Sequence, residues 1–182
     1  MKDNGANISY RVALGRIVSA LCLLSMLLAG VIPALYLVMP MISGFLIMFI
    51  AVEVNPQWAF LTYGAASLLS LLISLDKEAA LVFIMLFGHY PILRLYIKKL
   101  KSRIIRTVVK FAVLNICVTL FMLVTIYLLG LTDVLEWLEK NGKPAKIGIF
   151  ALVNVLFIFY EINLESSHYY YIKRIRSKFR QK

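Results

Sequence analysis

The chain has 182 residues, of which 62% are hydrophobic and 16% are charged, and its formal net charge is +11. A soluble domain is closer to half apolar and a quarter charged, and no soluble fold of this length has enough interior for so much apolar surface. The composition therefore excludes an ordinary soluble domain and predicts an all-α, polytopic bundle of membrane-spanning helices.

The first apolar stretch, Ile17–Val52, carries no charge and is too long for one spanning helix. It is also far longer than the apolar region of a cleaved signal peptide, so we expect it to be retained in the membrane. Gly30, Pro33 and Pro40 are possible break points, which allow two spans over residues 12–33 and 37–54, with Arg16 reaching to the interface. The second of these is short enough that a re-entrant segment is the alternative.

The next two spans are expected over residues 58–75 and 79–97. Pro56 suits the first turn of the earlier helix, and the acidic turn Asp76–Glu78 suits the N-terminus of the later one. Pro91 predicts a kink near the far end of the second helix of this pair.

The last two spans are expected over residues 107–131 and 147–163. The intervening segment, 132–146, mixes both signs of charge with an apolar pattern, which predicts a short amphipathic helix at the interface. This apolar pattern consists of Val134, Leu135, Trp137 and Leu138. Residues 164–182 form a basic juxtamembrane tail.

Two basic clusters orient the predicted spans. Residues 94–110 contain seven basic side chains and residues 173–182 contain six, and neither cluster has an acidic residue. Because Lys and Arg are retained on the cytoplasmic side, both clusters are expected there. An even number of spans must separate them from each other and from the weakly basic N-terminus. The sequence thus predicts a single integral membrane domain over 1–182, with six spans and both termini cytoplasmic.

Both clusters also carry apolar residues at helical spacing, as in Ile97, Leu100, Ile104 and Val108. This spacing predicts basic amphipathic helices that contact anionic lipid or an acidic partner protein. The basic residues assigned to this contact are Lys98, Lys99, Lys101, Arg103, Arg106, Lys173, Arg174 and Arg176. No nucleic-acid motif accompanies the charge, so membrane lipids are expected as partners and nucleic acid is not.

Polar residues inside predicted spans are candidate functional groups. Asn115 and Asn154 either bond a neighbouring helix or contact a substrate. Arg94 and Glu161 are expected at the same depth, where an inter-helix ion pair and a proton or substrate relay are both open. His89 is expected to bond a backbone carbonyl freed by Pro91, and protonation near neutral pH is the alternative.

Other kinds of chemistry are not expected. Cys22 and Cys117 lie in apolar runs and are predicted to be buried and unpaired. Glu165 and His168 make only half of a di-iron ligand motif, and no catalytic or nucleotide-binding motif is present. The sequence therefore predicts no enzyme activity, no metal and no cofactor.

The layout resembles a known family. Six short spans in about 180 residues, the stretch Phe87–Arg94, and Asn154 with Phe159–Glu161 are similar to S-component-like membrane proteins of Firmicutes. These resemble the substrate-binding S components of energy-coupling factor vitamin transporters. The resemblance implies a bacterial plasma-membrane protein that binds a small molecule for transport. It also implies that the small pair Gly15 and Ser19 faces a membrane-embedded coupling subunit.

A non-transporting scaffold is the alternative function. In residues 30–40, where the resemblance would place a ligand loop, Tyr36 is the only side chain that can form hydrogen bonds. Few polar groups on the external side and many basic groups on the cytoplasmic side favour an assembly role through the basic face.

Overall fold

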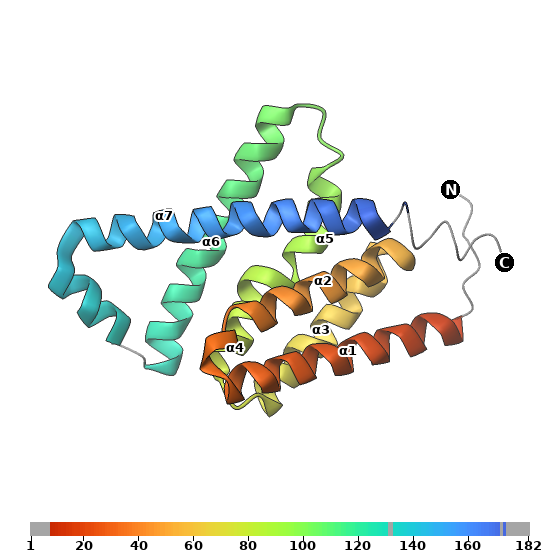
Figure 1. Ribbon diagram of the computed structural model, residues 1–182, viewed down its shortest axis with the longest axis horizontal. Coiled ribbons are helices and arrows are strands. Elements are labelled where there is room, and N and C mark those ends of the chain that lie inside the picture. Colours follow the sequence, from red (N-terminus) through yellow and green to blue (C-terminus); the bar gives the residue numbers. More distant parts are fainter. Residues whose placement is uncertain (1–7, 131–132, 172, 174–182) are drawn as a thin grey trace. The chain divides into compact units, whose positions relative to one another are not determined.

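The computed structural model describes residues 8–130, 133–171 and 173, and every regular element among them is a helix (Figure 1). The predicted all-α class is therefore confirmed for the described part of the chain. The chain has two compact units, residues 1–121 and 122–182.

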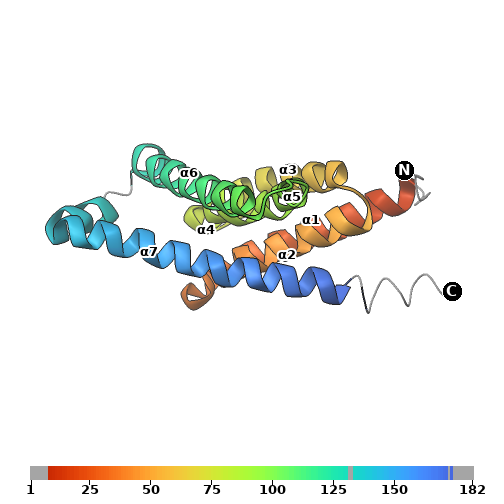
Figure 2. The ribbon, with the colours of Figure 1, turned by 90° about the horizontal axis from the view of Figure 1, so that it is seen from above.

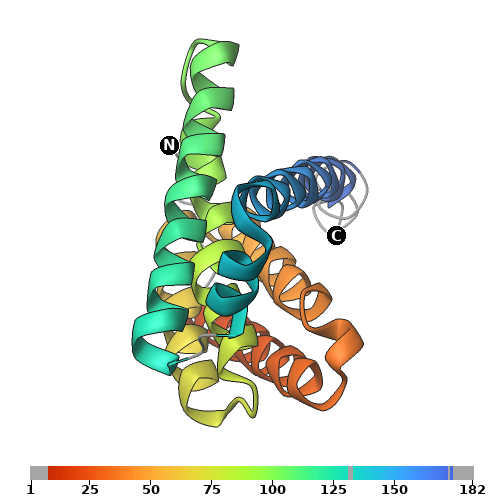
Figure 3. The same ribbon diagram turned by 90° about the vertical axis from the view of Figure 1, so that its left-hand side faces the viewer.

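The first unit opens with the predicted helix pair. Helix α1 covers Ile8–Val31, a 3₁₀ turn η1 covers Pro33–Leu35, and α2 covers Val38–Glu53 (Figure 3). The predicted division of the first apolar stretch near Pro33 is confirmed. Helix α2 has 16 residues, which is about 24 Å at 1.5 Å per residue.

Helix α3 covers Pro56–Ile73 and starts as expected. The side chain of Asn55 accepts a hydrogen bond from the Trp58 backbone N–H at 2.8 Å, and Pro56 occupies the first turn. Small residues let the helices approach closely, because lipid supplies no hydrophobic drive for their association. Ala66 and Ser70 are both buried, and the Ser74 hydroxyl reaches the Met26 carbonyl of α1 at 3.5 Å.

The next span is divided into three pieces: α4 (Lys77–Val82), the π-helix η2 (Phe83–Gly88) and α5 (Tyr90–Ile97). The Asp76 carboxylate caps it, accepting from the backbone N–H groups of Glu78 and Ala79. The kink expected from Pro91 is confirmed, since α5 restarts with this proline in its first turn. The π-helix that precedes it was not predicted.

One prediction about this unit is wrong. Residues 97–108 do not form one basic helix: α5 ends at Ile97 and α6 (Arg103–Leu129) begins after a turn. Two tight backbone bonds, from Lys99 and Leu100, close the turn, and Ser102 caps α6 through the Ile105 N–H. A chain that returns into the membrane must reverse here, and this requirement overrides the helical spacing. Figures 1 and 3 show the reversal as the green loop between α5 and α6.

The second unit consists of the end of α6 and the long helix α7 (Asp133–Tyr170). Gly142, with φ 69° and ψ −160°, interrupts α7 in a conformation that only glycine adopts easily. Figure 2 shows the resulting bend. The predicted short helix within 132–146 is therefore present from Asp133 to the break, although its apolar side chains lie outside the described residues. The helix that contains the predicted span 147–163 continues to Tyr170, and the end of the span stays a prediction.

Five of the described helices are long and apolar enough to cross a membrane: Ile8–Val31, Pro56–Ile73, Lys77–Ile97, Arg103–Tyr127 and Lys140–Tyr170. Helix α2 is apolar but shorter than these. Many large apolar side chains remain on the surface; Leu61, Leu72 and Ile104, for example, are 66%, 69% and 77% exposed. Such surfaces are stable against lipid and unfavourable in water, as expected of a membrane protein.

Candidate functional site

A polar cluster lies where the helix Lys77–Ile97, which contains the fourth predicted span, is broken. It consists of Tyr63 from α3, His89 from the junction of η2 and α5, Cys117 from α6, and the backbone carbonyl of Ile84 in η2. We call it the His89 cluster. It brings together segments separated by 21 and 28 residues in the sequence.

The hydrogen bonds determine which atoms of the cluster carry protons. The Tyr63 hydroxyl donates to the Ile84 carbonyl at 2.7 Å, and His89 Nδ1 lies 3.2 Å from the same oxygen. A carbonyl oxygen only accepts, so Nδ1 must carry a hydrogen. In the neutral imidazole Nε2 is then an acceptor, and it faces Cys117 Sγ at 3.5 Å. The thiol therefore donates to the ring.

Gly88 permits this arrangement. A Cβ atom at position 88 would lie 2.6 Å and 2.8 Å from two carbons of the Tyr63 ring and 2.9 Å from the Phe83 ring. Phe83 is fully buried, and its ring meets that of Tyr63 edge-on with centroids 5.9 Å apart. The space between α3 and η2 is thus too narrow for any side chain at position 88.

The cluster places polar side chains at the point where an apolar span is interrupted. His89 bonds a backbone carbonyl, as expected, but this carbonyl belongs to Ile84 in the π-helix. Tyr63 and Cys117 were not predicted as site residues. The one sequence feature that could have indicated Tyr63 is its place inside a predicted span, because a buried tyrosine hydroxyl needs a hydrogen-bond partner. Among the described residues no group of three or more His, Cys, Asp or Glu side chains could hold a metal ion.

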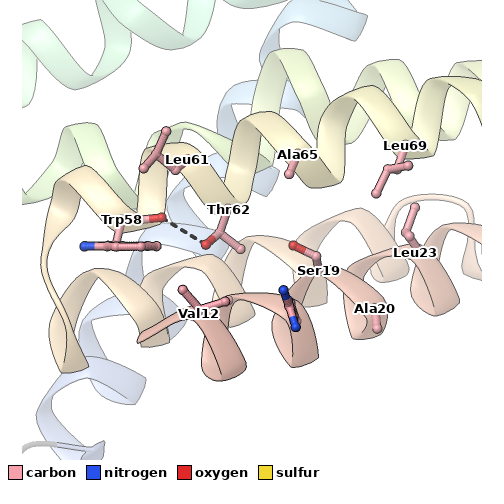
Figure 4. A pocket seen from close by; sticks show the side chains of 11 residues that line it. Val12, Ser19, Ala20, Leu23, Trp58, Leu61, Thr62, Ala65 and Leu69 are labelled. Atoms are coloured by element: carbon pink, nitrogen blue, oxygen red, sulfur yellow. Dashed lines mark hydrogen bonds between the residues drawn. The ribbon is translucent and has the colours of Figure 1, made fainter. Parts of the chain in front are cut away.

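A second feature of the first unit is an open groove of about 440 Å³ between α1 and α3. Figure 4 shows Ser19 and Leu23 of α1 directed toward α3, across from Thr62 and Leu69. The groove is lined by Val12, Gly15, Arg16, Ser19, Ala20, Leu23, Trp58, Leu61, Thr62, Ala65 and Leu69. Gly15 and Ser19, the pair predicted to meet a partner, therefore both line it. A Cβ at Gly15 would lie 3.2 Å from Thr62 Oγ1, so Gly15 also lets α1 and α3 approach.

A third feature joins the η1 turn to the start of α4. The Tyr36 hydroxyl donates to Glu78 Oε2 at 3.3 Å, over 42 residues of sequence. Burial, followed by the negative charges of Glu78 and Asp76, raises the pKa of Tyr36 above its ordinary value. The one polar side chain of the 30–40 loop is thus used to fasten this loop to the next helix hairpin.

Replacing Tyr36 with phenylalanine should lower stability by about 1 kcal/mol at neutral pH, because the hydrogen bond is lost. A raised folded-state pKa contributes stability that is complete below the ordinary tyrosine pKa, near 10, and is lost as pH rises further. The stability difference between wild type and Tyr36→Phe should therefore shrink when thermal unfolding in detergent is compared at roughly pH 8 and 11. Tyr127→Phe, at a side chain 83% exposed, is the control and should match wild type at neutral pH. A difference that stays constant with pH would contradict the assigned bond.

The two asparagine candidates bond within their own helices. Asn115 Nδ2 donates to the Phe111 carbonyl at 2.8 Å, and Asn154 Nδ2 donates to the Phe150 carbonyl at 2.7 Å. These are bonds to the residue four positions earlier, which any helix offers to a short polar side chain. A substrate role for Asn115 or Asn154 stays a prediction.

Arg94 is almost completely buried, with 1% of its side chain exposed, although it lies in the last turn of α5. Glu161 is half-buried on α7. Their pairing concerns both units of the chain and stays a prediction from the sequence. Both cysteines are free, as expected; Cys22 is buried and Cys117 is half-buried.

The basic residues assigned to lipid or partner contact fall into two groups. Lys99 and Lys101 lie exposed on the turn between α5 and α6, with Lys98 half-buried beside them, and Arg103 and Arg106 lie in the first turns of α6. Lys173 donates to the Tyr169 hydroxyl at 2.8 Å. Arg174, Arg176 and the rest of the predicted C-terminal amphipathic helix lie outside the described residues.

Comparisons with family models, with curated proteins and with solved structures found no match to this chain. The resemblance to S components therefore gains no support from them and stays an expectation based on the residues quoted for it.

Proposed function

We propose that this is a multi-pass protein of the bacterial plasma membrane that binds a small polar molecule at the His89 cluster, as a transport subunit does. The observation that carries the proposal is the broken span α4–η2–α5, with Tyr63, His89 and Cys117 meeting at the break. Transporters commonly place their substrate sites at discontinuous helices, and π-helices and intramembrane ionisable residues are frequent at functional sites.

Thiol chemistry provides the test. Cys117 is half-buried within the cluster, whereas Cys22 is 1% exposed in the core and serves as an internal control. In membrane vesicles, a small permeant maleimide should modify Cys117 faster than Cys22. A bound ligand should slow modification of Cys117 and raise the unfolding temperature of wild type, but not that of His89→Ala. If no vitamin or other small polar metabolite in a panel changes the rate of Cys117 modification or the unfolding temperature, the proposal is wrong.

The proposed topology has six spans with both termini in the cytoplasm. Five helices meet the length for a span, and α2 completes the count if the bilayer thins slightly around its 16 residues. A single cysteine at position 101, in a variant without Cys22 and Cys117, should react with an impermeant maleimide only from the cytoplasmic side. Reaction with the reagent added from outside would show that the orientation is the opposite of the one proposed.

A membrane scaffold with a basic cytoplasmic face is the second candidate function. The exposed lysines at the α5–α6 turn favour it. It predicts that replacing Lys98, Lys99 and Lys101 with Gln weakens cross-linking to an acidic partner while leaving Cys117 reactivity unchanged. Transport-type binding predicts that a ligand still protects Cys117 in this triple variant and that wild type is not cross-linked to an acidic partner, so the two assays separate the functions.

A further inference from the structure

We infer that the groove between α1 and α3 is a binding site for one anionic glycerophospholipid. Arg16 holds the headgroup phosphate, and an acyl chain follows the groove toward the centre of the membrane. This inference concerns a different surface from the His89 cluster and does not depend on the proposed function.

The direction of the two helices gives the groove a charged end and an apolar end. Gly15 lies against Thr62, and Met26 lies against Ser74, so the sequence offset between contacting residues is nearly constant. A constant offset means that α1 and α3 run parallel. Val12 and Trp58 therefore lie at one end of the groove, and Leu23 and Leu69 lie at the other (Figure 4). Arg16 lies on α1 one helical turn in from Val12.

The charge of the groove identifies the headgroup. Among the described residues that line it, Arg16 is the only charged one, and its side chain is exposed. Trp58, in the first turn of α3, is a residue type that marks the level of the lipid headgroups. The offset places Arg16 about one turn deeper than Trp58, and a long helical side chain that points back toward the helix N-terminus can carry its charge to the headgroup level. A guanidinium binds a phosphate through two parallel N–H bonds, which an ammonium group does not match.

The length and lining of the groove fit an acyl chain. From Arg16 to Leu23 the helix rises about 10 Å, so the groove holds the part of an acyl chain nearest the headgroup, within the ~15 Å hydrocarbon depth of one leaflet. The middle of the groove is kept open by small residues, Ser19, Ala20 and Ala65, and the Thr62 hydroxyl is already bonded to the Trp58 carbonyl at 2.9 Å. The floor beyond Arg16 thus offers mainly apolar contacts.

A lipid explains the groove better than a docked helix does. The rim carries exposed Leu61 and half-buried Trp58, which hold a second helix away from the small residues. A docked helix would also cover Arg16 and would need its own acid to compensate the charge. An anionic lipid supplies this charge at the interface without desolvating the arginine completely.

Fluorescence quenching provides the test. The chain has two tryptophans, so Trp137→Phe leaves Trp58 as the only tryptophan, which can be excited selectively over the ten tyrosines. The protein is reconstituted in phosphatidylcholine bilayers that contain increasing fractions of brominated phosphatidylglycerol or brominated phosphatidylcholine. Brominated phosphatidylglycerol should reach half of its maximal quenching at a lipid fraction about fivefold lower than brominated phosphatidylcholine does. The reason is that one basic residue near anionic lipid corresponds to about 1 kcal/mol.

Three variants in the same background define the outcome. Arg16→Gln should make the two lipids equivalent, whereas Lys77→Gln, which removes the same charge from an exposed position at the start of α4, should keep the preference. Ala65→Phe, at an exposed position, should fill the groove and weaken quenching by both lipids without lowering the unfolding temperature. Equal quenching by the two lipids in wild type, or an unchanged preference in Arg16→Gln, would overturn the inference. Conversion of a dimer to a monomer by Ala65→Phe would also overturn it, in favour of a second copy of this chain in the groove.

Discussion

Gly88→Ala is expected to destabilise the protein by about 1–3 kcal/mol, the usual cost of forcing extra atoms into a packed core. The added Cβ would lie less than 3.0 Å from both the Tyr63 and the Phe83 rings. Tyr63 cannot move away without weakening its 2.7 Å bond to the Ile84 carbonyl. Because this bond belongs to the His89 cluster, ligand protection of Cys117 should also be lost. Chemical and thermal unfolding in mild detergent measure the first effect.

Gly64→Ala is the matched control, because a Cβ at position 64 has nothing within 4 Å. This substitution should be neutral or slightly stabilising, since alanine favours the helical backbone more than glycine. Tyr63→Leu should partly rescue Gly88→Ala by removing the ring that the new methyl group strikes. If Gly88→Ala unfolds at the wild-type temperature, the close packing of η2 against α3 is wrong.

Arg94→Met is expected to cost about 3–5 kcal/mol, the range found when one member of a buried charged group is removed. The arginine side chain, which carries a positive charge, is 1% exposed. A charge in such a position is stable only when surrounding groups compensate it, and methionine would leave those groups uncompensated. Arg94→Lys keeps the charge but loses the planar fork of donors, so it should fall between wild type and Arg94→Met.

Lys101→Met provides the comparison for loss of one positive charge. Lys101 is exposed on the turn after α5, and its substitution should change stability by less than about 0.5 kcal/mol. Equilibrium unfolding of the three variants in the same detergent ranks them. Similar stabilities for Arg94→Met and Lys101→Met would show that the buried charge carries no structural role.

Much of the local structure follows from nearby residues. Asn55 with Pro56, and Asp76 before α4, predict two helix starts because a cap bonds to backbone groups only two or three positions away. The break near Pro33 follows from the same kind of local rule. The helical spacing of residues 97–108 led to a wrong helix, because periodicity alone carries no information about where the chain must reverse.

The candidate site was predicted only in part. His89 was identified as a residue that bonds a freed carbonyl, but the π-helix, Tyr63 and Cys117 were not connected with it. A π-helix has no reliable sequence pattern, since it differs from an α-helix by one residue in the bonding step. Gly88 is conspicuous only when the Tyr63 ring beside it is known.

By itself the sequence determined the class of this protein, through apolar runs of spanning length and helix starts at capping residues, and it predicts an orientation from its basic clusters. These properties depend on composition and on contacts within a few residues. Tertiary structure decided which polar groups meet, as Tyr63 and His89 do at the Ile84 carbonyl, and it made a groove with Arg16 near one end from two parallel helices. Both outcomes depend on the register in which distant helices pack, and this register is set by close contacts such as that of Gly88 with Tyr63.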